Sequence, residues 1–347
     1  MKFIHIADIH LGVAPEAGKL YSEKRPKEIW DTFKSILEIC EEEKTDLLLI
    51  AGDLFHRQPL LRELKEVDYL FSRLTHTKVV LIAGNHDYIR KDSYYRTFSW
   101  NENVFTLFNN EIGTVVFPEL ETAVYGLSYH EKEIKESLYD GLQPKKLAKY
   151  EILLGHGGDE QHIPIRRSTF TGTEFDYIAL GHIHRQQDIV PNHIIYAGSM
   201  EPTDKNDTGH HGFVRGEITE AGVRAVFVPY AKREYLHLVL PVDEKTTLHS
   251  LQDLISEVIL KRGRQHMYRF LLRGERAMEL EFPVEMKENY DNVLEIVDET
   301  EPALDMDRIY TENRNNLIGK YMEMFDYCEK DSVEYQALYE GLLALLK

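Results

Sequence analysis

The feature that most constrains the fold is a unit that recurs near the N-terminus, a short apolar run followed by polar side chains. Residues 2–7, 46–51 and 78–83 read KFIHIA, DLLLIA and KVVLIA. Between these runs, residues 27–43 and 61–74 carry apolar side chains at helical spacing. Strands that alternate with amphipathic helices are typical of βαβ units, so we predict parallel strands covered by helices.

From about residue 103 onward the apolar runs lie closer together, as in a protein with many strands. We expect strands at residues 104–108, 114–117, 122–127, 151–154, 177–180, 193–197, 213–218 and 223–228. This spacing favours a mixed, many-stranded core, with two stacked sheets as one arrangement. For residues 1–232 we therefore predict the α/β class, with a mixed β-sandwich core flanked by helices.

Two further segments follow a junction at residues 229–234. We predict that residues 233–304 form a small α+β domain and that residues 305–347 form a helical tail. In the small domain we expect a helix at 247–259 and strands at 235–242, 267–272 and 293–297. In the tail, apolar residues from Leu317 to Cys328 and from Leu338 to Leu345 predict two helices.

Five short polar motifs follow five of the predicted strands. In chain order they are Asp8-Ile9-His10, Gly52-Asp53-Leu54-Phe55-His56, Gly84-Asn85-His86-Asp87, Gly155-His156 and Gly181-His182-Ile183-His184. The carboxyl ends of the strands in such sheets are where binding sites form, so we expect these side chains to meet. Carboxylate, amide and imidazole ligands without a thiolate suit two divalent ions of Mn, Fe or Zn. Two close ions need a bridging carboxylate, and Asp53 is the natural bridge.

The order and spacing of these motifs resemble the signature of calcineurin-like metallophosphoesterases, and within them SbcD-type DNA nucleases. The resemblance covers about residues 1–232. It implies Mn as the favoured metal, although the ligand types alone also allow Fe or Zn. It also implies a ligand set for each ion. The first ion would bind Asp8, His10, Asp53 and His184, and the second would bind Asp53, Asn85, His156 and His182.

Three further side chains in the motifs have expected roles, and the same resemblance implies those of His86 and His56. His86 would protonate or stabilise the leaving oxygen. Asp87, the next residue, would hold the ring of His86. His56 would contact the scissile phosphate, because a histidine three residues after Asp53 resembles the nuclease branch more than the protein-phosphatase branch.

Outside the motifs, most polar residues are expected to have structural or surface roles. His162 is among ten histidines for which we expect surface exposure or packing. We interpret residues 198–202 as a turn in which Ser199 and Glu201 bond the loop, and residues 204–207 as a surface turn.

The net charge of −18 bears on the partners of the chain. DNA-binding domains are usually basic, and none of the three predicted segments is, so a partner could supply DNA affinity. The resemblance implies that the capping domain, residues 233–304, helps to orient duplex DNA. It also implies that the C-terminal helices hold the coiled-coil base of an SMC-like ATPase, and that the core forms a homodimer.

The leading hypothesis is a metal-dependent DNA exonuclease or endonuclease in repair or end processing. The alternative is a phosphodiesterase or phosphatase that acts on a small nucleotide or another small phosphoester, which the negative charge favours. A non-catalytic scaffold is disfavoured because all motif positions are intact. The chain has two cysteines, no apolar run long enough for a membrane span and no signal-peptide layout, so we expect a soluble, cytoplasmic protein.

Overall fold

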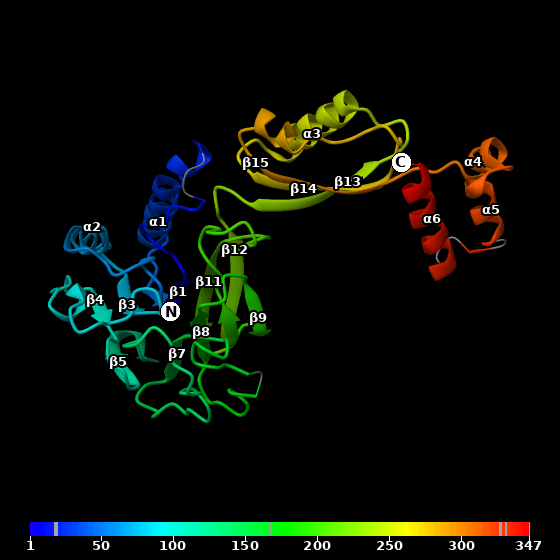
Figure 1. Cartoon of the computed structure of the whole chain (residues 1–347). Helices are drawn as coiled ribbons and strands as arrows, with labels where there is room; N and C mark the ends of the chain where they lie inside the picture. Colours follow the sequence, from blue (N-terminus) through cyan, green and yellow to red (C-terminus); the bar gives the residue numbers. More distant parts are fainter. Residues whose placement is uncertain (17–19, 167, 326–327, 330–331, 347) are drawn as a thin grey trace. The chain divides into compact units, whose positions relative to one another are not determined.

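The structure is a computed structural model that describes residues 1–16, 20–166, 168–325, 328–329 and 332–346. The chain forms two compact units (Figure 1). The first contains residues 1–236 and 263–268, and the second contains residues 237–262 and 269–347. In the described part of the chain, every helix is too short or too polar to cross a membrane.

The recurring units near the N-terminus form the centre of a six-stranded sheet in the first unit. Its order is β12-β11-β1-β2-β3-β4, in which β1 to β4 are parallel, β11 is antiparallel to β1, and β12 is antiparallel to β11. The strands are β1 (Lys2–Ile6), β2 (Leu47–Ala51), β3 (Lys78–Ile82), β4 (Val104–Thr106), β11 (Gly212–Thr219) and β12 (Gly222–Pro229). Two helices, α1 (Arg25–Glu42) and α2 (Leu61–Ser72), cover one face with their apolar sides.

A second six-stranded sheet has the order β5-β6-β7-β8-β10-β9. Its strands are β5 (Gly113–Phe117), β6 (Thr122–Gly126), β7 (Tyr150–His156), β8 (Tyr177–Gly181), β9 (Gln187–Val190) and β10 (Ile194–Tyr196). Short 3-10 helices lie at η1 (Leu20–Glu23), η2 (Tyr94–Arg96) and η3 (Pro118–Leu120). The strand β9 was not predicted, because this edge strand is largely exposed and has no continuous apolar run.

The two sheets stack on each other, which explains why the central strands are apolar along their whole length. Alternate side chains of a strand point to opposite faces of its sheet. Leu48 and Ile50 of β2 therefore pack with the helices, whereas Leu47 and Leu49 pack with side chains of the second sheet such as Ile152. The predicted mixed β-sandwich flanked by helices is confirmed.

The small α+β domain has the expected elements. A three-stranded sheet is formed by β13 (Tyr235–Val242), β14 (Met267–Arg276) and β15 (Val293–Pro302), in that order. The helix α3 (Leu248–Arg262) buries Leu251, Ile255 and Ile259 at a spacing of one helical turn, and η4 (Val284–Asn289) precedes β15. The assignment of residues 233–304 to a capping domain stays a prediction.

Three helices lie in the described part of the tail, so the prediction of two was wrong. They are α4 (Met306–Asn313), α5 (Leu317–Glu323) and α6 (Val333–Leu346). No residue of α4 is buried, so this helix has no apolar stripe by which to recognise it. The apolar residues expected on one helix from Leu317 to Cys328 do not all lie on it, because α5 ends at Glu323 and Cys328 lies beyond it.

Candidate metal centre

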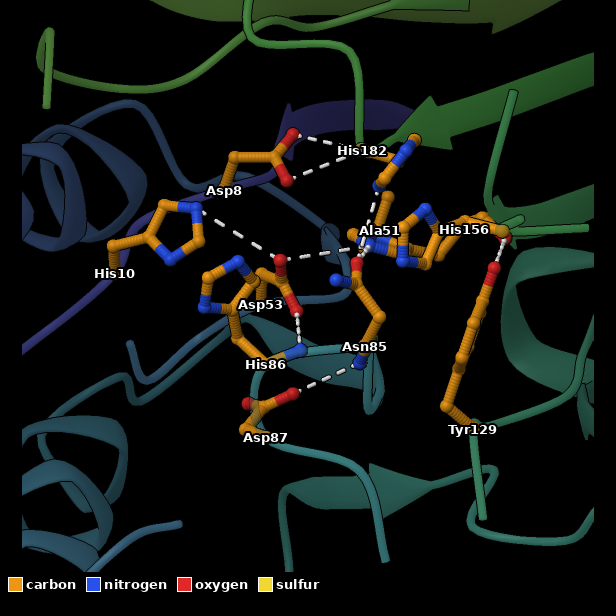
Figure 2. Close-up of polar contacts among 12 residues, drawn as sticks. Asp8, His10, Ala51, Asp53, Asn85, His86, Asp87, Tyr129, His156 and His182 are labelled. Atoms are coloured by element: carbon orange, nitrogen blue, oxygen red, sulfur yellow. Dashed lines mark hydrogen bonds and ion pairs between the residues drawn. The ribbon is translucent and has the colours of Figure 1, made fainter. Parts of the chain in front are cut away.

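The structure brings the five motifs together at the carboxyl ends of strands from both sheets (Figure 2). Asp8, Asp53 and Asn85 follow β1, β2 and β3 of the first sheet. His156 is the last residue of β7, and His182 directly follows β8 in the second sheet. Since neighbouring strands in each group are parallel, their ends converge on one place, as the sequence predicted.

Four of the expected ligands have unusual backbone conformations. The φ angles of Asp8, His10, Asp53 and His182 are 49°, 50°, 51° and 95°. Positive φ costs a residue with a side chain about 1–2 kcal/mol, and such strain gathers at functional sites. The loops therefore hold these side chains in place at a cost to folding.

One cluster of potential ligands contains Asp8, His10 and His184, whose ligand atoms all lie within 4.8 Å of one another. The Nε2 atoms of His10 and His184 face each other at 3.0 Å. Although burial lowers the pKa of His184, its neighbouring carboxylates raise the pKa to about 9, so the charged ring can donate a hydrogen bond to His10. A cation bound between these nitrogens would replace that proton.

A second cluster surrounds the side-chain oxygen of Asn85. This oxygen lies 3.0 Å from His156 Nε2 and 3.1 Å from His182 Nδ1. Asp53 lies between the clusters, because its Oδ2 is 3.6 Å from His156 Nε2 and 3.8 Å from His10 Nε2. Asp53 thus occupies the place that a shared carboxylate ligand would need.

The hydrogen bonds outside the clusters fix the orientation of the histidine rings. His156 donates from Nδ1 to the carbonyl oxygen of Ala51 at 2.8 Å, and His182 donates from Nε2 to Asp159 at 2.8 Å. Burial lowers the pKa of His156 to about 3 and that of His182 to about 4, so both rings are neutral. Each therefore turns an unprotonated nitrogen toward the cluster, which is the arrangement that a metal ligand requires.

The carboxylates of the site also fit a bound cation. Asp8 is fully buried, and burial raises its pKa to about 8, with a further contribution from Asp53. Burying two negative charges so close together is unfavourable unless positive charge offsets them. The donor set of oxygen and imidazole nitrogen, without a thiolate, suits divalent ions. Two groups of potential ligands at this place could each hold an ion: Asp8, His10 and His184, and Asp8, Asp53 and His156.

The two other histidines of the motifs lie beside the first cluster. The ring of His86 is centred 4.7 Å from that of His10 and 5.0 Å from that of His56. The backbone nitrogen of His86 donates to Asp53 Oδ1 at 2.9 Å, which ties His86 to the candidate ligand. All three rings are close enough to act on one substrate.

The structure corrects the partner that we expected for His86. Its Nδ1 contacts the carbonyl oxygen of His56 at 3.0 Å, rather than the carboxylate of Asp87. Asp87 instead accepts hydrogen bonds from the backbone of Phe55 and Gly84 and from the Tyr95 hydroxyl, at 3.1, 2.8 and 2.9 Å. Its buried carboxylate thus joins the loops after β2 and β3, so the expected hold on the His86 ring was wrong.

Three residues near the site were not recognised as functional in the sequence. Asp159 accepts from His182, His162 packs its ring 4.7 Å from that of His182, and Asp207 contacts His184 Nδ1 at 3.1 Å. The sequence predicts a surface turn at Asp207, yet only 15% of its side chain is exposed. No sequence signal marks these residues, because they lie in irregular loops outside the motifs.

Replacing Gly84 with alanine is expected to disrupt the candidate centre. The added Cβ would lie 2.2 Å from Asp53 Oδ1 and 2.7 Å from His156 Nε2, and both side chains would have to move. We expect the variant to lose at least about tenfold in metal affinity, as for disturbed ligand positions in general. Metal content measured by mass spectrometry, with circular dichroism to verify folding, tests this. Full metal content in the folded variant would contradict it.

The comparisons with known proteins agree with this geometry. A family model described as calcineurin-like phosphoesterase matches residues 1–186, which include every candidate ligand. The DNA double-strand break repair protein Mre11 of Methanocaldococcus jannaschii is 31% identical over 219 residues, which cover 60% of this chain and 58% of that protein. The uncharacterized metallophosphoesterase YhaO of Bacillus subtilis is 27% identical over 307 residues, or 79% of this chain and 72% of that protein. This chain thus spans less than two thirds of the Mre11 relative, and it belongs to the calcineurin-like phosphoesterase family.

Proposed function

We propose that the chain is a two-metal phosphodiesterase that cleaves DNA in repair or end processing, as an exonuclease or endonuclease. Membership of the family already implies a phosphoester hydrolase. The observation that carries the proposal is the placement of His56 and His86 beside Asp53, next to two clusters of potential metal ligands. The DNA repair activity named for the Mre11 relative supports DNA as the substrate.

In this proposal, each ion has its own ligands and the two share Asp53. The first ion would bind Asp8, His10, Asp53 and His184, and the second would bind Asp53, Asn85, His156 and His182. Oδ2 of Asp53 lies within 4 Å of a histidine from each set, which supports a shared ligand. We propose Mn for both positions, with Fe or Zn compatible with the same donors.

The side chains of the site then have separate tasks. Divalent ions held here would supply an activated water and positive charge for the phosphate oxygens. His86, whose Nδ1 is bound to the His56 carbonyl, keeps Nε2 for the departing sugar oxygen. His56 would contact the scissile phosphate. Asp87 serves the site indirectly, because its contacts with Phe55 and Gly84 fix the two loops that carry these histidines.

Partners follow from the same proposal. Three apolar residues of the tail are largely exposed. They are Leu317 in α5 at 68%, Met324 at 78% and Val333 in α6 at 80%. We propose that residues 305–347 bind an SMC-like coiled-coil ATPase through this surface, that residues 233–304 act as a capping domain, and that the core, residues 1–232, forms a homodimer. The net charge of −18 agrees with a partner that contributes to DNA binding. We propose a cytoplasmic location for the protein.

The second candidate is a phosphodiesterase or phosphatase that acts on a small nucleotide or another small phosphoester. The negative charge favours it, because a protein that binds the DNA backbone needs positive charge. The same metal centre would serve, so only the substrate distinguishes the two candidates.

Cleavage in Mn²⁺ of a labelled DNA duplex, a labelled single strand and bis-p-nitrophenyl phosphate tests the proposal. We expect DNA to be cut, and His86→Ala to lower that rate by about 10²–10⁴, the usual contribution of a general acid. His76→Ala, which changes an exposed histidine just before β3, is the control and should keep the full rate. If only the small ester is hydrolysed, the second candidate replaces the first.

A further inference from the structure

Two aspartates outside the five motifs contact the candidate metal centre from its outer side. Asp159 lies in the loop after β7, and Asp207 lies in the loop between β10 and β11. Each contacts one histidine of the Gly181–His184 motif, on the ring nitrogen that faces away from the clusters. The two contacts therefore form a pair, one for His182 and one for His184.

Local hydrogen bonds hold the carboxylate of Asp159 in place. Its Oδ1 accepts from the backbone nitrogens of Gln161 and His162 at 2.8 and 2.9 Å, and its carboxylate contacts His162 Nδ1 at 2.9 Å. The buried Ile163 that follows has φ of 38°, an unfavourable angle for a β-branched residue. With Oδ1 held by these backbone groups, Oδ2 of Asp159 contacts His182 Nε2 at 2.8 Å.

Asp207 is held in a similar way by its own loop. Its Oδ2 accepts from the backbone and hydroxyl of Thr203 at 2.9 and 3.0 Å, and from the backbone of Asp204 at 3.2 Å. The same oxygen contacts His184 Nδ1 at 3.1 Å. Local hydrogen bonds therefore hold both aspartates, and each carboxylate also contacts one histidine of the motif.

The two histidines belong to different clusters. His182 turns Nδ1 to Asn85 in the second cluster, and His184 turns Nε2 to His10 in the first. A carboxylate bound to the outer nitrogen fixes the ring of a metal ligand and increases its basicity. Each aspartate can therefore act on one cluster without touching the other.

We infer that Asp159 and Asp207 are positioning residues, each for a different one of the two metal ions. The inference rests on the proposed two-metal centre, and it is independent of DNA as the substrate. Loss of Asp159 weakens the ion that binds His182, and loss of Asp207 weakens the ion that binds His184. Such outer contacts change metal affinity by about 10–100-fold.

Titration of the full-length protein with Mn²⁺ by calorimetry, together with metal content after dialysis, tests this. In Asp159→Asn and in Asp207→Asn, one of two ions should bind about 10–100-fold more weakly, while the other stays within about twofold. Asp204→Asn is the control, because Asp204 lies in the same loop as Asp207 and its side chain contacts Asn206 instead of a histidine. This variant should bind both ions as the unchanged protein does.

A second set of variants identifies which ion each aspartate serves. In a His182→Ala background, Asp159→Asn should have no further effect on the remaining ion, whereas Asp207→Asn should still weaken it about 10–100-fold. Should Asp159→Asn or Asp207→Asn fail to fold, His162→Ala or Thr203→Val replaces it, since each removes a contact that holds the same carboxylate.

Three results would overturn the inference: equal weakening of both ions by each variant, unchanged affinity in both variants, or additive effects of Asp159→Asn and His182→Ala. Selective metal loss in a protein that does not cut DNA would keep the inference and reject the nuclease proposal. DNA cleavage with unchanged metal affinity in both variants would do the reverse.

Discussion

Asp53→Asn should abolish Mn²⁺ binding at both positions and lower phosphodiester hydrolysis by about a thousandfold or more. Asp53 Oδ2 lies 3.8 Å from a histidine of the first cluster, His10, and 3.6 Å from one of the second, His156. The variant keeps the shape of the side chain and removes the charge that the two ions would share. Metal ions contribute several kcal/mol to such reactions, and each 1.36 kcal/mol is a factor of ten in rate.

The stability of the same variant separates this loss from misfolding. Burial raises the pKa of Asp53, which means that its negative charge is unfavourable in the fold without a cation. We therefore expect Asp53→Asn, measured with a chelator present, to melt at or above the temperature of the unchanged protein, in keeping with the trade-off between function and stability.

Hydrolysis of bis-p-nitrophenyl phosphate, metal content and thermal melting are the measurements. Asp92→Asn, an exposed aspartate paired with Arg90, provides the control and should keep both metal and activity. A folded Asp53→Asn protein that retains two ions and its full rate would show that Asp53 is not shared between them.

The sandwich core could be predicted because its central strands are buried on both faces. Residues 47–51, for example, are all fully buried, so selection for burial leaves an unbroken apolar run that is visible in the sequence. The edge strand β9 and the exposed helix α4 bury little, so neither leaves such a run. The conformation of β9 depends on pairing with β10, and that of α4 depends on capping by Asp305. Residue types alone indicate both interactions only weakly.

The same difference applies to the candidate site. Residues that directly follow strands are placed by the sheet, so the convergence of Asp8, Asp53 and His156 could be predicted from their positions in the sequence. The contacts of Asp87, Asp159 and Asp207 depend on how irregular loops fold against each other. Asp87 is an example. It follows His86 in the sequence, which suggested a contact between the two side chains, but its carboxylate accepts from the backbone of Phe55 and Gly84 instead.

Arg25→Met should destabilise the first unit by about 3–5 kcal/mol, the usual cost of leaving a buried charge without its partner. Arg25 is completely buried at the start of α1, and it donates twice to Glu201 at 3.2 Å and once to Glu28 at 2.8 Å. Glu201 is also buried, and its other oxygen accepts from Thr32 and from the backbone of Lys232, both at 2.7 Å. The remaining contacts cannot replace the positive charge.

The effect should extend to the metal centre, because Glu201 belongs to the loop that supports His184. In this loop the backbone nitrogen of Ser199 donates to the carbonyl oxygen of His184 at 2.9 Å, and Asp207 binds its ring. Denaturant unfolding and Mn²⁺ titration measure the two effects. Arg215→Met, which breaks an exposed ion pair with Glu43, should cost at most about 1 kcal/mol and leave Mn²⁺ affinity unchanged. An equally small cost for Arg25→Met would mean that Glu201 can be buried without Arg25, and that the loop holding His184 is stabilised by its other contacts.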